Sequence, residues 1–373
     1  TWVPPHTMET TYEYNSLGEV ISNYSPDAGT KKYIYDSRKR LRFSQDERQL
    51  ENGSFSFIKY DDLGRPVEVG ESDVTLAAID FDSPQFQVLQ SNLDKANNLN
   101  FPFIGNSRVI RTIYNFPSML NYYGTDQTFV QNRVSYTIRD EDGDFNTLND
   151  QFKTHFSYDA HGNIKWVIQD DPIIGKNYIA YEYDLMSSKI LEIKYNEKRM
   201  DRFFHRYRYD SNNRLVKTET SRDHVIWDED ATYDYYLHGA AKREERGDDD
   251  IQGTDIVFTI NGWLKGINNS SAADKDPGQD GVGGTTDFME DVFGMSLGYY
   301  AGDFTRGDNT NSNVFTGRNQ YNPTTDLYNG NISSWSTRTN TGETSTDGTN
   351  YFEYSYDNLQ RIRSSHYSYS TDP

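Results

Sequence analysis

The stretch Ile58-Lys-Tyr60-Asp61-Asp-Leu-Gly64-Arg-Pro-Val67 decides the fold, because its pattern recurs along the chain. Each copy joins an aromatic-x-Tyr pair to an Asp, then a turn residue three positions later, a polar residue and an aliphatic one. The other copies are Tyr12-Glu-Tyr14-Asn15-Ser-Leu-Gly18, Tyr33-Ile-Tyr35-Asp36, Phe156-Ser-Tyr158-Asp159-Ala-His-Gly162, Tyr181-Glu-Tyr183-Asp184, Tyr207-Arg-Tyr209-Asp210, Tyr233-Asp-Tyr235-Tyr236 and Tyr354-Ser-Tyr356-Asp357.

The spacing of the copies is regular. Tyr14 and Tyr35 are 21 residues apart, and Tyr35 and Tyr60 are 25 apart. From Tyr158 the next three intervals, which end at Tyr235, are 25, 26 and 26 residues. A fixed period of this length is the signature of a repeat architecture, in which each repeat is one supersecondary unit.

Each position of the repeat has a physical role. Tyrosines at i and i+2 lie on one face of a strand, where we expect their rings to stack on rings of the next strand. The Asp starts a turn by accepting hydrogen bonds from backbone N–H groups just after it. Glycine three residues later adopts a left-handed conformation without strain. This place is taken by Gly18, Gly64 and Gly162, and in other copies by Lys39, Asn213 and Gln360. The unit is therefore a strand–turn–strand.

The number of repeats predicts the architecture. About eight such units, two strands each at roughly 4.8 Å spacing, would make a ribbon about 75 Å wide. Open twisted sheets rarely exceed about ten strands without curling or splitting. We therefore predict an all-β fold: a spiralling antiparallel β-sheet of strand–turn–strand repeats that forms a curved shell.

The composition fits a thin, aromatic-rich sheet. The 373 residues include 29 Tyr and 20 Phe, although only 34% are hydrophobic and the net charge is −20. An acidic surface repels phosphate backbones, so nucleic acid is a poor partner. No apolar run is long enough for a membrane-spanning helix. The absence of cysteine excludes disulfide frameworks, thiol nucleophiles and Cys-ligated metals.

We expect residues 1–373 to form one continuous repeat region of a longer protein, since the chain begins Thr1-Trp2-Val3 without a Met or a leader. The segment 72–106 is expected to be an irregular insertion, and the Gly/Ser/Asp/Asn-rich segment 268–286 a mobile loop. Residues 337–350 are predicted to be a polar tip, and 108–114 and 133–139 to be strands. No segment shows a helical stripe.

Candidate sites for chemistry are weak. Gly294-Met-Ser296-Leu-Gly298 matches the nucleophile-elbow pattern, but no helix is expected after it, so Ser296 is interpreted as a turn residue. The acidic segments 140–144 and 274–281 lack the ligand spacing of a calcium loop and are interpreted as solvated surface loops. The seven histidines are scattered without metal spacing. We predict no catalytic residue, no metal site and no cofactor.

In its Tyr-Asp units, such as Tyr60-Asp61 and Tyr158-Asp159, the chain resembles the YD (RHS) repeats of bacterial RHS proteins, Tc-toxin shell subunits and animal teneurins. Further stretches look like RHS proteins of Bacteroidota-type bacteria, among them Phe258-Thr-Ile-Asn-Gly-Trp-Leu-Lys-Gly266 and Phe293-Gly-Met-Ser-Leu-Gly-Tyr-Tyr300. The resemblance implies a β-sheet cocoon that in relatives encloses a C-terminal toxic polypeptide. The family's self-cleaving core segment does not follow the last repeat here, so no protease activity is assigned.

Two functions follow as expectations. The first is a structural shell segment of a secreted or surface-displayed RHS-repeat protein that encloses and helps deliver a C-terminal effector, a polymorphic toxin. Its partners would be that C-terminal polypeptide of the same parent chain and a secretion machinery. The alternative is an extracellular adhesin whose exposed aromatic side chains bind surface glycans. An enzymatic function ranks lowest.

Overall fold

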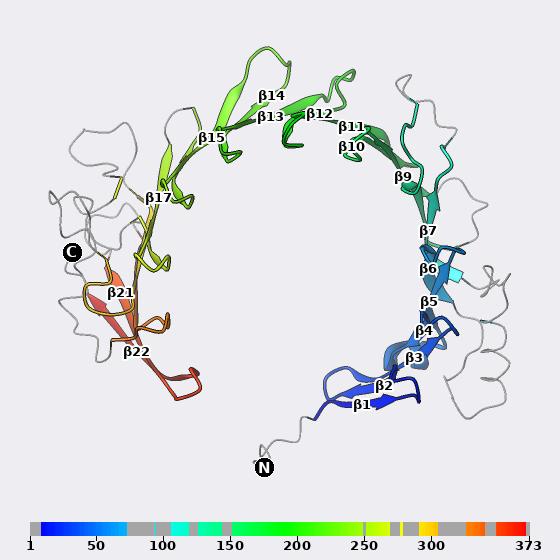
Figure 1. Cartoon of the computed structure of the whole chain (residues 1–373), viewed down its shortest axis with the longest axis horizontal. Coiled ribbons are helices and arrows are strands. Elements are labelled where there is room, and N and C mark those ends of the chain that lie inside the picture. Colours follow the sequence, from blue (N-terminus) through cyan, green and yellow to red (C-terminus); the bar gives the residue numbers. More distant parts are fainter. Residues whose placement is uncertain are drawn as a thin grey trace. The chain divides into compact units, whose positions relative to one another are not determined.

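The structure is a computed structural model that describes residues 9–72, 93, 106–118, 126–143, 151–248, 251–268, 277–278, 291–304, 326–339 and 348–370. Within these residues the chain forms 22 strands and one short helix (Figure 1). Consecutive strands pair antiparallel wherever pairing is described, which confirms the all-β antiparallel fold predicted from the repeats.

The strands of the first half, in chain order, are β1 (Thr11–Tyr14), β2 (Val20–Ser25), β3 (Gly29–Tyr35), β4 (Leu41–Gln45), β5 (Phe55–Tyr60), β6 (Pro66–Ser72), β7 (Asn106–Tyr114), β8 (Val134–Asp140), β9 (Phe152–Tyr158), β10 (Ile164–Asp171) and β11 (Gly175–Tyr183). Those of the second half are β12 (Ile190–Tyr195), β13 (Phe203–Tyr209), β14 (Leu215–Ser221), β15 (Asp228–Tyr235), β16 (Ala241–Arg246), β17 (Gln252–Phe258), β18 (Leu264–Ile267), β19 (Phe293–Gly298), β20 (Ser334–Thr339), β21 (Thr349–Tyr356) and β22 (Ile362–Ser370).

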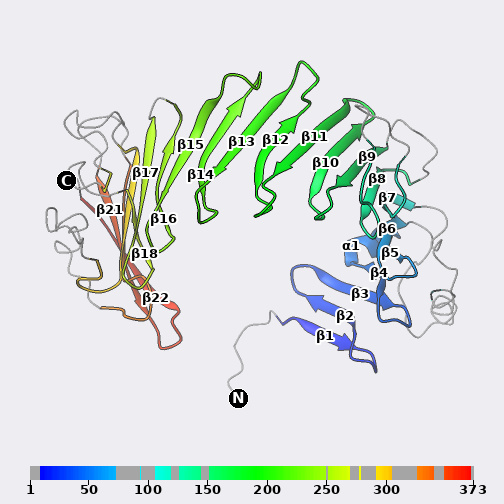
Figure 2. The same cartoon turned by 45° about the horizontal axis from the view of Figure 1, so that its top comes forward.

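The chain divides into two compact units. Unit 1 comprises residues 1–182 and 194–200, and unit 2 comprises residues 183–193 and 201–373. In unit 1 each strand from β1 to β11 pairs with the next in sequence. In unit 2 the same holds from β13 to β22. Each unit is thus a meander of hairpins, as Figure 2 shows.

The turn after each repeat tyrosine follows one design, seen clearly at Asp61. The Gly64 N–H donates to the Asp61 carbonyl at 2.9 Å, and the Asp61 N–H donates to the Arg65 carbonyl at 3.0 Å. The Asp61 carboxylate accepts from the Arg65 N–H at 2.8 Å. Gly64 has φ of 80°, and the strand register shifts between Lys59 and Tyr60. This is a type I turn closed by a left-handed residue that forms a β-bulge.

The left-handed position holds different residues in different repeats. Gly18 and Gly162 have φ of 81° and 96°, whereas Lys39, Asn213 and Gln360 have φ of 63°, 62° and 62°. The turn at Asp184 is one residue longer, and there the Ser188 N–H donates to the Asp184 carbonyl at 2.9 Å. At Lys39, Asn213 and Gln360 the turn therefore forms in spite of the strain of a left-handed side chain, and in each of these repeats an Asp begins the turn.

The hydrophobic core is thin. In unit 1, Phe43 and Phe55 meet edge to face with ring centroids 5.0 Å apart, and Trp166, Ile168 and Tyr178 form a second buried cluster. Among the described residues, buried polar and charged side chains outnumber buried hydrophobic ones. The sheet is therefore held mainly by its hydrogen-bonded ladders and by polar side-chain contacts.

Several expectations from the sequence need correction or fall outside the description. A helix, α1 (Glu47–Asn52), is capped by Asp46 and was not expected from any helical pattern. The predicted strands at 108–114 and 133–139 are confirmed as β7 and β8. The predicted polar tip 337–350 is wrong at its ends, which belong to β20 and β21. Nearly all of the predicted insertion 72–106 and most of the loop 268–286 lie outside the described residues.

We predict that Gly64→Val lowers the free energy of unfolding by about 1–2 kcal/mol, because a side chain in the left-handed conformation carries about that much strain. A Cβ at Gly64 would have only the Arg40 guanidinium nearby, at 3.8 Å, so a clash is not the cause. Gly64→Asn is the matched control, since Asn213 occupies the equivalent place, and its loss should be smaller. Urea unfolding measures both, and equal stability of Gly64→Val and wild type would contradict this turn assignment.

Candidate functional site: a tyrosine–arginine clamp between repeats

In six of the eight repeats the second tyrosine donates a hydrogen bond to the preceding repeat. The Tyr60 hydroxyl donates to the Leu41 carbonyl at 3.0 Å, and the Tyr235 hydroxyl donates to the Leu215 carbonyl at 2.7 Å. The acceptor is in each case the residue that opens the return strand of the preceding hairpin. The same bond is made by Tyr35 to Val20, Tyr158 to Val134, Tyr209 to Ile190 and Tyr356 to Ile332.

An arginine completes the contact. Arg40 forms an ion pair with Asp36 of its own turn at 2.7 Å, and its guanidinium lies 4.7 Å from the ring centroid of Tyr60. Arg214 pairs with Asp210 at 2.7 Å and lies 4.6 Å from the Tyr235 ring. A cation over an aromatic face is attracted by the ring quadrupole. We call this set of Asp, Arg, backbone carbonyl and following Tyr the clamp.

The clamp replaces the ring-on-ring stacking expected from the sequence. At Tyr60, Tyr158 and Tyr235 the ring is covered by an arginine of the preceding repeat. The tyrosine therefore joins two repeats through its hydroxyl and its face together. Arginine suits this position because its planar guanidinium binds a carboxylate with one edge and stacks with its face.

Two contacts of a similar kind lie where the regular spacing of the repeats is interrupted. Tyr114 donates to the Pro66 carbonyl at 3.1 Å, and Arg65 lies 4.2 Å from its ring centroid. Tyr299 donates to the Leu264 carbonyl at 2.9 Å, with Trp263 in the place of arginine at 5.0 Å between ring centroids. The irregular stretches of the sequence thus keep the contact between the tyrosine and the preceding hairpin.

Electrostatics follow from this packing. Burial raises the pKa of Tyr60, which the nearby Arg40 opposes, and burial likewise raises the pKa of Tyr158. Partial burial pushes the pKa of Asp61 upward, but hydrogen bonds from Arg65 outweigh it and hold that pKa below its ordinary value. Tyr60 and Tyr158 are therefore neutral donors, and Asp61 is a charged acceptor near neutral pH.

The structure places every predicted repeat residue at a hairpin end. Tyr35, Tyr60, Tyr158, Tyr209, Tyr235 and Tyr356 each donate the hydrogen bond to the preceding hairpin. Turns are held by Asp36, Asp61, Asp159, Asp184, Asp210 and Asp357, and Gly18, Gly64 and Gly162 are left-handed. Tyr14 ends β1 and Tyr183 ends β11. The arginines of the clamp were not predicted from the sequence. Their signal is the Arg four residues after Asp36, Asp61, Asp210 and Asp357.

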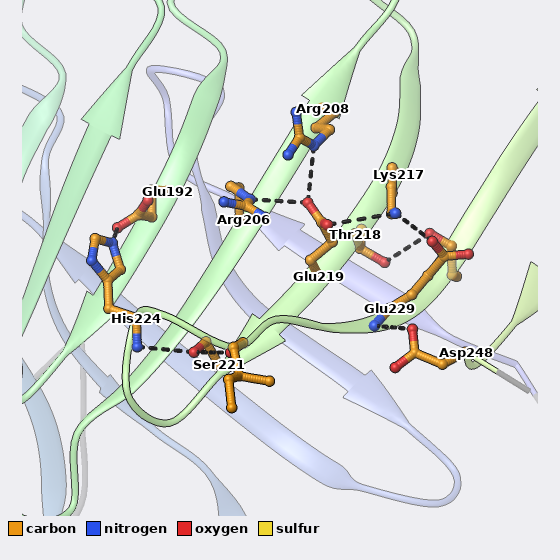
Figure 3. Close-up of polar contacts among 12 residues, drawn as sticks. Glu192, Arg206, Arg208, Lys217, Thr218, Glu219, Ser221, His224, Glu229 and Asp248 are labelled. Carbon is orange, nitrogen blue, oxygen red and sulfur yellow. Dashed lines mark hydrogen bonds and ion pairs between the residues drawn. The ribbon is translucent and has the colours of Figure 1, made fainter.

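A second polar cluster lies on one face of β13, β14 and β15 in unit 2 (Figure 3). Glu219 accepts from Arg206 and from Arg208, each at 2.9 Å. Lys217 lies 3.5 Å from Glu219 and also pairs with Glu229. Only 9% of the Glu219 side chain is exposed, so this carboxylate is a buried anion shared by three cations.

The hairpin after β14 folds back onto this cluster. Its His224 Nε2 lies 2.8 Å from a Glu192 carboxylate oxygen, and the His224 ring lies 4.6 Å from that of Phe204. Arg206 lies 3.9 Å from the ring centroid of Trp227. The loop is therefore anchored by aromatic and charged contacts.

The charge distribution depresses the pKa of Glu219. Burial alone would raise it, but hydrogen bonds and attraction from Arg206 and Arg208 lower the pKa to about 2, from an ordinary value of 4.5. A carboxylate held by cations in this way stabilises cross-strand pairing only while it is ionised. The arrangement is suited to joining strands.

The predicted turn position of Ser296 is wrong. Ser296 lies in the middle of β19, opposite Ser336 of β20 and Gly266 of β18. The two glycines that flank the pattern belong to the strand as well. A nucleophile elbow requires the serine at a turn between a strand and a helix, and this serine is not at one.

His155 is a second candidate for chemistry. Its Nδ1 lies 2.9 Å from the Ser118 hydroxyl, and burial lowers its pKa to about 4. Nε2 has no hydrogen-bond partner among the described residues, so no carboxylate orients the ring as in a catalytic triad. We interpret the pair as a polar contact that fastens the segment around Ser118 to β9.

In the acidic segment 140–144, the expectation of a solvated loop is wrong at Asp140 only, since Glu141 and Asp142 are exposed. Asp140 ends β8, is buried, and accepts from the Gly143 N–H at 2.6 Å. The other acidic segment, 274–281, lies largely outside the description. Across the described ranges, no group of three or more His, Asp or Glu side chains is placed to hold a metal ion. No helix within those ranges is long and apolar enough to cross a membrane.

No protein-family model matches the chain, and no curated protein matches it. Among solved structures, the chain is similar to the crystal structure of TcdB2-TccC3, with a TM-score of 0.52 and 12% identity over 96% of this chain. It spans 16% of that structure's chain. A structure of the Photorhabdus luminescens Tc holotoxin pore matches at a TM-score of 0.31 and 13% identity, over 96% of this chain and 16% of that one. The first likeness shows a shared fold.

We predict that Glu219→Gln reduces the dependence of stability on acid. With a folded-state pKa of about 2 against an ordinary 4.5, the carboxylate's contribution is complete above about pH 4.5 and is lost as the pH falls toward 2. Urea unfolding at about pH 6 and about pH 3 should show a smaller loss in Glu219→Gln than in wild type. The control Glu51→Gln, at an exposed position of α1, should follow wild type. Equal losses in wild type and Glu219→Gln would contradict the assignment.

Proposed function

We propose that this chain is a wall segment of an RHS-type shell in a toxin-associated protein, and that the shell encloses and helps deliver a C-terminal effector. The observation that carries the proposal is the shared fold with TcdB2-TccC3 over 96% of the chain. Under this proposal the chain is also related to the Bacteroidota-type RHS proteins and to the teneurins, which its repeat sequence resembles.

The clamp supports a wall. Each clamp joins one hairpin to the next through a tyrosine, an arginine and a backbone carbonyl, without requiring a thick hydrophobic layer on either face. A sheet built in this way extends by adding repeats, because each repeat contacts only its neighbours. Long sheets of antiparallel hairpins curl as strand twist accumulates, which favours an enclosing wall.

The partners and location belong to the same proposal. A shell would hold the C-terminal polypeptide of its own parent chain, and a secretion machinery would export the whole to the cell surface or the medium. The chain itself would supply no catalytic residue. Its buried charged groups, among them Glu219 and the Lys265–Asp303 pair at 2.8 Å, are engaged with one another and serve to join strands.

A second candidate function is glycan binding by an adhesin. It is favoured by Tyr328, which is 69% exposed and stacks on Tyr300 with ring centroids 4.6 Å apart. The side chain of Asn261 lies 3.3 Å from the Tyr300 hydroxyl. Exposed aromatic faces beside amide groups are able to stack on sugar rings.

Electron cryo-microscopy of the intact parent protein tests the shell. We expect the strands to continue beyond this segment, the wall to close, and the enclosed volume to contain density for further polypeptide. An open sheet, or a closed one that is empty, would contradict the proposal.

Protease protection of the same protein sharpens the test. The C-terminal polypeptide should resist trypsin in wild type and become cleavable when Tyr60→Ala and Tyr235→Ala break two clamps. The control Tyr24→Ala removes a half-exposed tyrosine of β2 and should leave protection intact. Glycan binding that Tyr328→Ala abolishes, together with an unprotected C-terminus, would favour the adhesin.

A further inference from the structure

A gap opens between β8 and β9 at the end of β9 that carries Tyr158. The ladder between the two strands ends at the pair formed by Tyr136 and His155. Beyond this pair, Val134 of β8 still pairs with β7, and residues 156–158 of β9 still pair with β10. The two hairpins therefore separate at this end, and the backbone groups that face the gap need other partners.

A polar bridge, made of Ser118, Gln127 and Thr128, fills the gap. The Gln127 side-chain amide donates to the Ser135 carbonyl of β8 at 2.8 Å and to the Phe156 carbonyl of β9 at 2.7 Å. Its oxygen accepts from the Ser118 N–H at 2.5 Å and from the Ser135 hydroxyl at 3.2 Å. Every donor and acceptor position of this amide is thus used, and the amide joins the two strands.

Thr128 continues the bridge along β9 as a neighbouring strand would. Its N–H donates to the Ser157 hydroxyl at 3.0 Å, and its hydroxyl donates to the Tyr158 carbonyl at 2.7 Å. Its carbonyl accepts from the Tyr158 N–H at 3.1 Å. Ser135 and Ser157 are completely buried, so the polar bridge closes the sheet at this place and keeps water out of the gap.

His155 is the buried side chain against which the polar bridge rests. It is 4% exposed, the Tyr136 ring stacks on it with ring centroids 5.4 Å apart, and its Nδ1 lies 2.9 Å from the Ser118 hydroxyl. Its Nε2 is covered and has no hydrogen-bond partner among the described residues. Protonation places a hydrogen on both ring nitrogens. The charged ring would then hold an N–H without an acceptor inside the sheet, which is unfavourable.

The surroundings of His155 do not compensate a positive charge. Burial is the main effect, and it lowers the pKa of His155 from 6.5 to about 4. Asp170 opposes this shift but pairs with Lys176, and Lys176 and Lys153 lower the pKa further. In residues 115–118 and 126–130 the charged side chain is that of the exposed Asp126. By element, the groups that face His155 are Tyr136 of β8, Lys153 of β9 itself, Ile168 and Asp170 of β10, and Lys176 of β11.

We propose that the polar bridge is an acid-operated closure of the sheet: protonation of His155 expels Ser118 and Gln127, and β8 then separates from β9 at this end. The coupling is a chain of hydrogen bonds from His155 through Ser118 and Gln127 to the carbonyls of both strands. All of these residues lie in unit 1 and cover one another. The inference goes beyond the shell proposed above and does not depend on it.

The direction of the pH effect follows from the two states of the histidine. With the bridge in place the pKa of His155 is about 4, and in the open state it returns toward 6.5, so the open state binds the proton more tightly. The closed state is therefore favoured in full above about pH 6.5, and its advantage falls as the pH drops toward 4. From pH 7.5 to pH 4.5 the ratio of open to closed molecules should rise about 70-fold.

Hydrogen exchange of the whole chain at pH 7.5 and pH 4.5, corrected for the intrinsic exchange rates, tests the closure. We expect the protection of the Thr128 and Tyr158 amides to fall by tens of fold at pH 4.5, while the ladder between β5 and β6 keeps its protection. His155→Gln cannot take up the proton and should remain protected at both pH values. The matched control His161→Gln, at the exposed tip of the next turn, should respond as wild type does.

A reversible lock separates this opening from other effects of acid. Thr128 Oγ1 and Ser157 Oγ lie 3.2 Å apart, so cysteines at both positions are within reach of a disulfide, and the chain has no other cysteine. The oxidised Thr128→Cys/Ser157→Cys variant should lose the acid response, and reduction should restore it. This variant also decides the question if circular dichroism shows that His155→Gln does not fold.

Two results would overturn the proposal. One is equal protection of Thr128 and Tyr158 at pH 7.5 and pH 4.5 in wild type. The other is an acid response that persists in folded His155→Gln or in the oxidised lock, since acid would then loosen the sheet by another route. Neither result bears on whether the chain encloses a polypeptide, which electron cryo-microscopy of the parent protein decides separately.

Discussion

The hydrogen bond from a repeat tyrosine to the backbone carbonyl of the preceding hairpin is the contact on which the sheet depends, together with the arginine that covers the ring. Hydrogen bonds of this kind contribute about 1 kcal/mol each, and an arginine over a tyrosine about 0.5–1 kcal/mol at a partly exposed site. Each contribution is small, but the hydrogen bond recurs from Tyr35 to Tyr356, and an arginine covers the ring at Tyr60, Tyr114, Tyr158 and Tyr235. It fixes where each hairpin lies against its neighbour, which strand pairing alone would leave free to slip.

The polar character of the sheet has a consequence for stability. Charged groups that are nearly covered by protein come in pairs, such as Lys59 with Glu68 at 2.6 Å and Lys265 with Asp303 at 2.8 Å. Removing one member of such a pair leaves an uncompensated charge, which costs more than the pair itself contributes. The chain therefore tolerates its net charge of −20 because many of its carboxylates are held locally by turns and cross-strand cations. A sheet of this type gains its rigidity from specific pairs rather than from bulk hydrophobic packing.

Local backbone constraints made much of the fold predictable from the sequence. Asp61 and Gly64 predict a turn because the residues that form it lie within four positions of one another, so the pattern can be recognised in a short stretch of sequence. The role of Arg65 was missed because this arginine covers the ring of Tyr114, and Tyr114 lies in the part of the sequence where the regular spacing of the repeats is interrupted. Helix α1 was missed because a six-residue helix shows no periodic stripe. Ser296 was misread because flanking glycines suggest a turn, whereas here they lie within a strand.

A double-mutant cycle on Arg214 and Tyr235 tests the clamp most directly. Free energies of urea unfolding of wild type, Arg214→Met, Tyr235→Leu and the double variant give the coupling between the two side chains. The account predicts a favourable coupling of about 1 kcal/mol, and none between Arg214→Met and Tyr60→Leu, which lie in separate clamps. A coupling below about 0.3 kcal/mol for Arg214 and Tyr235 would show that the two side chains lie close together without stabilising the fold. That result would contradict the account.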